Sequence, residues 1–194
     1  MRILVDIDGT LRNVWPAVNA HIRDATGVHI PAPWMSYDWP LRYVDADVTN
    51  DAYRAVCGDY HDSSHWYPGA WDAMHALRRG GIDPVFCTLN PYRQARTIRR
   101  QLARAYGWPP HVVRVLNSKN KVKVAKTLGA VGIIDDKPAT LEAFRAAGLF
   151  TATINHEYNR EVEVDYRFDD WRSCNIADAV YTYGGQYPLF REAV

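Results

Sequence analysis

Two carboxylates stand one residue apart near the start of the chain, directly after a short apolar run. The run 3–5 is rich in branched side chains and leads into Asp6, Ile7, Asp8, Gly9 and Thr10. Such a run bounded by a turn is typical of a buried strand in a parallel sheet. Because an unpaired buried charge is costly, we expect a cation close to the two acids. The segment therefore predicts a ligand site at the carboxyl end of this strand, where open α/β sheets bind ligands.

Polar side chains also follow two later apolar runs. Thr88 comes after the run 83–87, and Asp135 and Asp136 come after the run 131–134. Four lysines precede the second of these runs: Lys119, Lys121, Lys123 and Lys126. If the runs are parallel strands, their carboxyl ends meet at one edge of the sheet. Four converging acids suit Mg²⁺, whereas a lysine and a hydroxyl suit a phosphate, so the set predicts phosphoryl transfer with a carboxylate as nucleophile.

The alternation of strands and helices predicts how these groups are positioned. Further strands are expected at 112–116 and 150–154, and helices at 15–25, 68–79, 92–106, 121–128, 140–147 and 175–183. This order predicts an α/β fold with a doubly wound, parallel, Rossmann-like sheet. The segment 30–65 differs, because prolines and aromatic residues crowd together and only a short helix at 50–56 is indicated. We therefore expect a core of 1–29 and 66–194 with a small, mainly helical cap insert at 30–65.

The overall composition limits the possible partners and the cellular compartment. A formal net charge of +1 gives no general electrostatic case for nucleic acid or membrane binding, although local patches remain possible. Three widely spaced cysteines argue against a disulfide framework and for a reducing compartment. No apolar run approaches the roughly 20 residues that a membrane span needs. We expect a cytoplasmic protein, monomeric or homodimeric, with no membrane association.

The motifs resemble those of haloacid dehalogenase-like phosphatases in order and in strand context. The resemblance rests on Asp6-Ile7-Asp8-Gly9-Thr10, then Thr88, then a lysine, then Asp135-Asp136. It implies that Asp6 attacks phosphorus and forms an aspartyl-phosphate. Asp8 would be the general acid for the leaving group and then the base for the hydrolytic water.

The same resemblance implies a phosphate site and a Mg²⁺ site. Thr88 would hold a phosphate oxygen, and a lysine would neutralise its charge. Asp6, Asp135 and Asp136 would hold the metal together with the backbone carbonyl of Asp8. Which of Asp135 and Asp136 ligates the metal directly stays open at this point.

A narrower resemblance is to the 5′(3′)-deoxyribonucleotidase branch. The stretch 65–71, His-Trp-Tyr-Pro-Gly-Ala-Trp, and the sequences 135–138 and 169–171 fit that layout. The second motif departs from it, since this chain has Thr88-Leu89-Asn90-Pro91 where the branch has Thr-Ser-Pro. The branch also carries its lysine in the next helix, where this chain has only arginines. The lysine must then come from the cluster 119–126, as in the phosphatase domain of polynucleotide kinases. Lys121 is favoured over Lys119 and Lys123, because it lies nearest the expected helix start.

The favoured function is a Mg²⁺-dependent phosphomonoesterase acting on a small phosphorylated metabolite, namely a nucleoside or deoxynucleoside monophosphate. Its candidate substrate-binding residues are Gly9, Thr10, Leu89, Asn90, Tyr37 and Trp39. One alternative is a polynucleotide end-processing phosphatase, which the arginines of the helix 92–106 and the lysine cluster would favour. Another is a non-catalytic binding protein on the same fold, since fold alone does not fix function.

Overall fold

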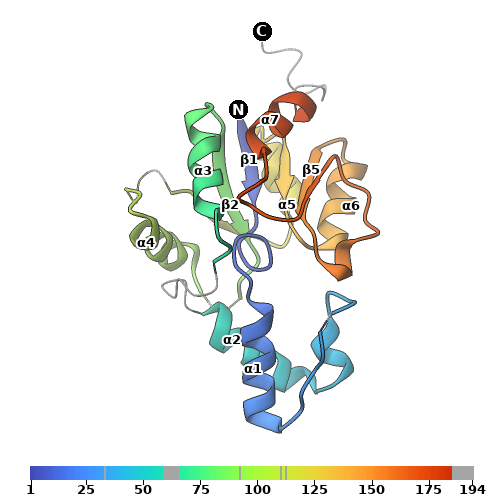
Figure 1. Ribbon diagram of the computed structural model, residues 1–194. Helices are drawn as coiled ribbons and strands as arrows, with labels where there is room; N and C mark the ends of the chain where they lie inside the picture. Colours follow the sequence, from blue (N-terminus) through green and yellow to red (C-terminus); the bar gives the residue numbers. More distant parts are fainter. Residues whose placement is uncertain (33, 59–65, 92, 110, 112, 185–194) are drawn as a thin grey trace.

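The sheet consists of six strands that all run parallel. In a computed structural model, residues 1–32, 34–58, 66–91, 93–109, 111 and 113–184 are described. The strands are β1 (Arg2–Val5), β2 (Asp83–Thr88), β3 (Val115–Asn117), β4 (Gly132–Ile134), β5 (Phe150–Ile154) and β6 (Tyr166–Phe168). Their order is β3-β2-β1-β4-β5-β6. The strands β2 and β3 are added on one side of β1, and the strands β4, β5 and β6 are added on its other side. The prediction of a doubly wound parallel α/β sheet is confirmed (Figure 1).

Two strands differ from the sequence prediction. The strand β6 was not predicted, because it is three residues long and carries a charged Arg167 at its centre. A strand was predicted at 112–116, but β3 begins at Val115 and ends at Asn117; Val112 lies outside the described residues. Both strands lie at the edges of the sheet, where side chains are only partly buried and the apolar pattern is weak.

Helices cover both faces of the sheet. On one face, α3 (Ala70–Arg79), α4 (Ala95–Tyr106) and α7 (Ile176–Ala179) pack in a cluster with Ile3 and Val5. On the other face, α5 (Lys121–Leu128) and α6 (Pro138–Ala146) pack in a cluster with Leu4. Alternate side chains of β1 therefore pack into two hydrophobic clusters, one on each face of the sheet, as expected for a strand buried on both faces. After α7 the chain continues as a π-helical turn, η4 (Val180–Gly184). No helix in the described ranges combines the length and the apolar character that crossing a membrane requires.

A third hydrophobic cluster lies beyond the carboxyl edge of the sheet. It is built by α1 (Trp15–Thr26), the 3-10 turn η1 (Trp39–Arg42) and α2 (Ala46–Cys57), which Figure 1 shows together below the strand arrowheads. The helix α2 is longer than the predicted helix at 50–56, because its buried face uses the small residues Thr49, Ala52 and Cys57. Since α1 packs into this cluster, we propose that the cap begins near Val14 and not at residue 30. Of the expected insert 30–65, residues 33 and 59–65 lie outside the described part of the chain.

Candidate active site

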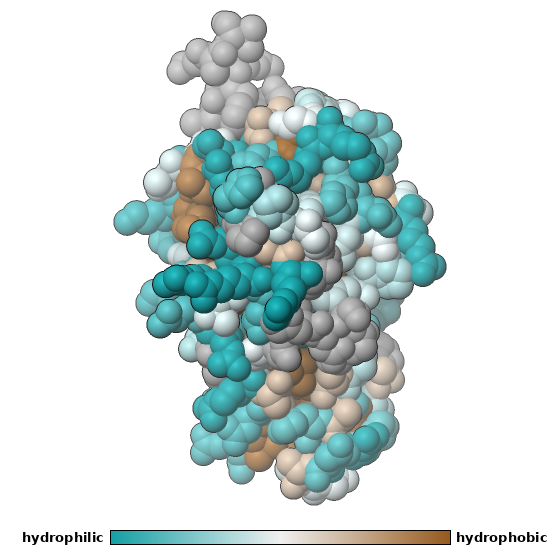
Figure 2. Space-filling view, turned by 90° about the vertical axis from the view of Figure 1, so that its left-hand side faces the viewer, coloured by the Kyte–Doolittle hydropathy of each residue, from teal (hydrophilic) through white to brown (hydrophobic). Residues whose placement is uncertain are grey.

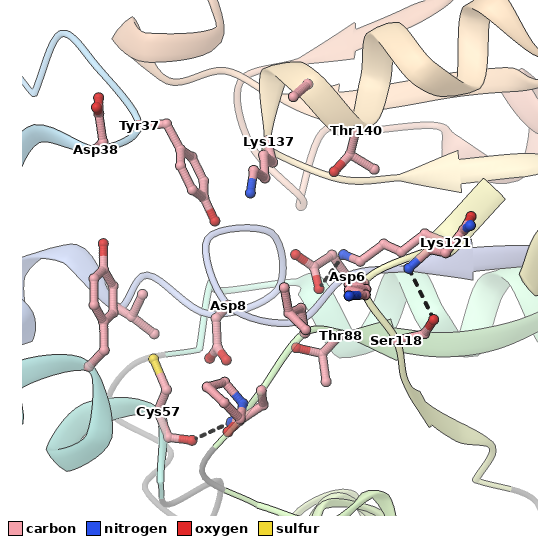
Figure 3. A pocket seen from close by; sticks show the side chains of 18 of the residues that line it. Asp6, Asp8, Tyr37, Asp38, Cys57, Thr88, Ser118, Lys121, Lys137 and Thr140 are labelled. Atoms are coloured by element: carbon pink, nitrogen blue, oxygen red, sulfur yellow. Dashed lines mark hydrogen bonds and ion pairs between the residues drawn. The ribbon is translucent and has the colours of Figure 1, made fainter. Parts of the chain in front are cut away.

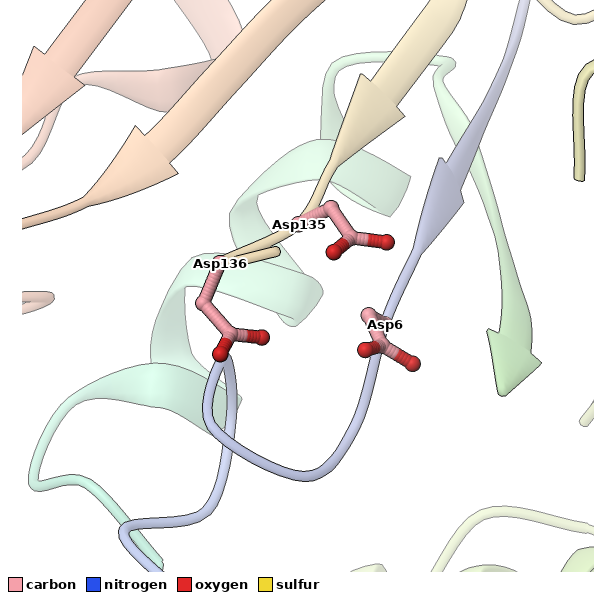
Figure 4. Close-up of side chains that lie close together, drawn as sticks. All are labelled: Asp6, Asp135 and Asp136. Carbon is pink, nitrogen blue, oxygen red and sulfur yellow. The ribbon is translucent and has the colours of Figure 1, made fainter. Parts of the chain in front are cut away.

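Three carboxylates meet at the carboxyl ends of two neighbouring strands (Figure 4). Asp6 follows β1, and Asp135 and Asp136 follow β4. One oxygen from each of the three lies within 4.8 Å of the other two, and all three side chains are buried. The predicted convergence of these acids is therefore found in the structure, and its cause is the direct pairing of β1 with β4.

Lys121 is the lysine that reaches the acids. It is the first residue of α5, and its Nζ lies 2.9 Å from Asp6 Oδ1 and 2.7 Å from Asp135 Oδ2. Burial lowers the pKa of Lys121, but Asp135 and Asp6 outweigh this effect and raise the pKa above its ordinary value. Lys119 and Lys123, the two alternatives, are exposed. The side chain at position 121 is therefore a buried, charged ammonium between two of the carboxylates.

If all three carboxyl groups are ionised, their negative charge exceeds the positive charge of Lys121. Burial raises the pKa of Asp6 well above its ordinary value, and the charges of Asp135 and Asp136 add to this against the opposing effect of Lys121. Burial, with the charge of Asp135, likewise raises the pKa of Asp136 to about 7. Three ionised carboxylates in one buried group need additional positive charge. Hard oxygen donors of this kind could hold a divalent cation such as Mg²⁺.

Asp136 is held by residues on both sides. Thr10 Oγ1 donates to Asp136 Oδ1 (2.9 Å), and the Tyr158 hydroxyl donates to Asp136 Oδ2 (2.7 Å). Gly9 makes the close approach possible, because it has a φ of 86° and a Cβ there would lie 2.2 Å from Asp136 Oδ2. Gly9 and Thr10 were predicted to bind substrate, but the structure places them against Asp136 and outside the pocket lining.

A cavity of about 820 Å³ opens between the sheet edge and the cap (Figure 3). From the core, Asp6, Asp8, Thr88 and Lys121 line it, and from the cap Tyr37 and Tyr53 do so. Leu89 and Asn90, two further predicted residues, also line this cavity. The structure thus brings the four predicted catalytic residues and three of the six predicted substrate-binding residues to one cavity.

Trp39 lies elsewhere than expected. Its side chain is only 2% exposed and is absent from the cavity lining. Trp34 stacks on it with ring centroids 5.0 Å apart, and Trp15 packs edge-on at 6.3 Å. Both neighbours belong to the cap core, so Trp39 stabilises the cap and offers no face to a substrate.

Several residues around the site were not predicted from the sequence. Arg12 is fully buried, and its Nη1 donates to Asp8 Oδ1 at 2.9 Å. Tyr158 accepts a hydrogen bond from Trp15 Nε1 (3.0 Å) and donates one to Asp136. It therefore connects the cap to the acidic group, by which we mean Asp6, Asp135 and Asp136. His156 stacks on Tyr158, and its Nε2 contacts the Gly9 carbonyl at 2.8 Å. Only the spacing of Arg12 from Asp8, four residues, was visible in the sequence.

No family model matches the chain, and no curated protein sequence matches it. Solved structures do match. A predicted phosphoglycolate phosphatase from Haemophilus somnus 129PT has a TM-score of 0.59 at 18% identity, covering 88% of this chain and 94% of that one.

Two further structures extend this likeness. A haloacid dehalogenase-like family hydrolase from Streptococcus pneumoniae has a TM-score of 0.60 at 14% identity, covering 93% of this chain and 97% of that one. CbbY from Rhodobacter sphaeroides, solved in complex with phosphate, has a TM-score of 0.57 at 18% identity, covering 89% of this chain and 95% of that one. With the parallel sheet and its cap, these matches show that the chain has the fold of the haloacid dehalogenase-like hydrolases.

Proposed function

We propose that this protein is a Mg²⁺-dependent phosphomonoesterase that works through an aspartyl-phosphate on Asp6. The observation that carries the proposal is the buried group of Asp6, Asp135 and Asp136 with Lys121 bridging two of them at the cavity. An anionic nucleophile and an anionic phosphate repel each other, so such a reaction needs cations at this point. Lys121 supplies one, and the carboxylates are suited to hold the other.

In this proposal, the chain's own side chains take part in two chemical steps. Asp6 forms a bond to phosphorus while the ester P–O bond breaks, and Asp8 gives its proton to the leaving oxygen. Asp8 then takes a proton from water, the water oxygen bonds to phosphorus, and the P–O bond to Asp6 breaks. Lys121 and Thr88 bind phosphate oxygens in both steps. Bound Mg²⁺ would supply charge neutralisation for the phosphoryl group.

Replacement of the proposed general acid should depend on the leaving group. For Asp8→Asn we expect kcat/KM on an alkyl phosphate to fall by roughly 10²- to 10⁴-fold, the usual value of a positioned proton donor. p-Nitrophenolate leaves without a proton, so kcat/KM on p-nitrophenyl phosphate should fall much less. Steady-state kinetics on both esters checks this, and equal losses on the two would remove Asp8 from the acid role.

We further propose that the substrate is a nucleoside or deoxynucleoside monophosphate. The cavity volume lies within the ordinary range for small-molecule sites. Two tyrosines of the cap, Tyr37 and Tyr53, face this cavity, and the Lys137 ammonium lies 5.0 Å from the centroid of the Tyr37 ring. An aromatic ring opposite a phosphate site is suited to a base, since every base has a face that can stack.

A substrate panel tests this proposal. Stacking is worth roughly 1–3 kcal/mol, so nucleoside monophosphates should be preferred over phosphorylated sugars by about 10- to 100-fold in kcat/KM. Tyr37→Ala should remove that preference and leave turnover of p-nitrophenyl phosphate nearly unchanged. Tyr43→Ala is the matched control, because Tyr43 is an exposed cap tyrosine outside the cavity lining. A preference that survives Tyr37→Ala would exclude this ring as the base contact.

A second candidate function is supported by the distribution of charge. Between residues 84 and 134 the chain has ten lysines and arginines and no Asp or Glu, although the whole chain is nearly neutral. Arg96, Arg99, Arg100 and Arg104 are exposed on α4, and none of them forms an ion pair within the described part of the chain. Figure 2 faces the side on which α4 lies in Figure 1 and shows long hydrophilic side chains across it. This surface favours a polynucleotide end-phosphatase.

The same panel separates the two candidates. A nucleotide pocket under a cap should take free mononucleotides better than 3′- or 5′-phosphorylated oligonucleotides. If the oligonucleotides are better substrates, and their advantage disappears between low and moderate salt, α4 is a recognition surface for the strand. The end-phosphatase function would then replace the mononucleotidase.

A further inference from the structure

The last turn of the cap helix α2 is bound by side chains of the core. Arg12 Nη2 donates to the Val56 carbonyl (3.3 Å), and Asn90 Nδ2 donates to the Cys57 carbonyl (2.8 Å). Arg93 Nε donates to the Gly58 carbonyl (2.7 Å). Three consecutive carbonyls at the end of one cap helix are thus bound by three core side chains, which we call the cap clamp.

The cap clamp has a clear physical basis. The final carbonyls of a helix have no partner within the helix and carry the negative end of its dipole. Two of the three donors are arginines, whose positive charge strengthens these hydrogen bonds. Asn90 is itself fixed, because its backbone N–H donates to Asn117 Oδ1 at 3.0 Å. The clamp therefore favours one position of α2 relative to the sheet.

Arg12 differs from the other two donors, because it also binds Asp8. Its Nη1 lies 2.9 Å from Asp8 Oδ1, and the arginine side chain is completely buried. Its guanidinium lies 5.6 Å from the centroid of the Trp66 ring. The backbone N–H of Arg12 donates to the Ile7 carbonyl, and the Arg12 carbonyl accepts from the Gly9 N–H. The backbone of Arg12 is therefore bound to the residues on both sides of Asp8. One guanidinium thus joins the proposed general acid to the end of the cap helix.

We propose that Arg12 is a positioning residue that holds Asp8 in its working orientation and couples this orientation to the docking of α2. This inference rests on the proposed phosphomonoesterase function. When α2 is docked, the Val56 carbonyl fixes one arm of the guanidinium and the other arm fixes Asp8 Oδ1. This contact at Oδ1 restricts the rotation of the Asp8 carboxyl group. If α2 moves away, Arg12 loses its hydrogen bond to the Val56 carbonyl, and Asp8 is held less firmly in its orientation.

Arg12→Lys is the first test variant. Lysine keeps the charge but lacks the planar fork, so it cannot hold Asp8 and the Val56 carbonyl together. Misplacing a reacting group by about 1 Å can cost roughly 100-fold. We expect kcat/KM on an alkyl phosphate to fall by about 10- to 100-fold. On p-nitrophenyl phosphate, which needs no proton from Asp8, the fall should be only a few-fold.

A double-mutant cycle shows whether Arg12 acts through Asp8. In the Asp8→Asn background, Arg12→Lys should cause almost no further loss on the alkyl phosphate, because the group that it positions is already gone. An undiminished Arg12→Lys penalty in that background would overturn the proposal. Equal losses on the alkyl and aryl esters in the single variant would overturn it as well.

Two further arginines provide controls. Arg93→Met removes a clamp contact without touching Asp8, so it should lower the ratio of alkyl to aryl activity less than Arg12→Lys does. Arg167→Lys alters a half-buried arginine that donates to the carbonyl of Asn159 in the core, and it should leave both activities unchanged. Thermal unfolding of each variant confirms that the comparison is made between folded proteins.

Hydrogen exchange tests the clamp independently of turnover. Arg12→Met, or Arg12→Lys if the methionine variant does not fold, should speed amide exchange in the last turn of α2, and unchanged exchange would overturn the coupling. A wild type without activity on any phosphomonoester would overturn the proposed function and the role in positioning Asp8 with it. An active wild type with additive Arg12 and Asp8 effects would overturn this inference alone.

Discussion

Asp6→Asn should yield a folded protein that hydrolyses phosphomonoesters at no measurable rate. Asparagine has nearly the shape of aspartate, so the packing at the end of β1 is preserved. Its amide is neither an effective nucleophile toward phosphorus nor an anionic ligand for Mg²⁺, so both roles proposed for Asp6 are lost together. Activity within about tenfold of the wild type, roughly 1.4 kcal/mol of barrier, would exclude the covalent mechanism.

The stability of this variant is the control for its folding. Burial raises the pKa of Asp6, so its ionised form disfavours the folded state near neutral pH. The neutral amide removes that cost, and Lys121 keeps its contact with Asp135. Without metal, we therefore expect a Tm no lower than that of the wild type. Asp51→Asn, at an exposed cap acid paired with Arg54, is the matched substitution that should keep full activity.

The parts of the fold that could be predicted are those whose signal is local. A run of branched residues that ends on Asp6 and Asp8 indicates both a buried strand and the edge at which it ends. The same holds for β4 with Asp135 and Asp136. Lys121 could be chosen from its cluster because the first residue of a helix after a strand lies close to the sheet edge. In each case a few neighbouring residues carried the information.

The remaining features depend on contacts between distant segments. Arg12 follows an apolar residue and looks like a surface charge, but its partner Val56 lies 44 residues away. Tyr158 lies between β5 and the unpredicted β6, in a stretch without a periodic pattern. For Trp39, composition could not show whether the ring faces a pocket or the cap interior. Only the packing of Trp34 and Trp15 against it decides this.

Removal of divalent metal should abolish activity, and Mg²⁺ should restore it. Three carboxylates with oxygens within 4.8 Å of one another have the donor type that Mg²⁺ prefers. Ca²⁺ should be a poor substitute, because its longer bonds and larger number of ligands would displace a phosphoryl group relative to Asp6. The measurement is turnover after chelation and gel filtration, with each metal added back. Full activity in excess chelator would refute the metal site.

Binding of the metal can be measured without turnover. A ligand at about 100 times its Kd stabilises the folded state by roughly 2.7 kcal/mol, which for a chain of this size raises Tm by about 5 to 10 °C. We expect such a shift with Mg²⁺ in the wild type and its loss in Asp136→Asn, which removes one anionic ligand. Asp51→Asn should keep the shift, since Asp51 lies on α2 and outside the acidic group. An equal shift in Asp136→Asn would place the bound metal elsewhere and separate it from the three acids at the ends of β1 and β4.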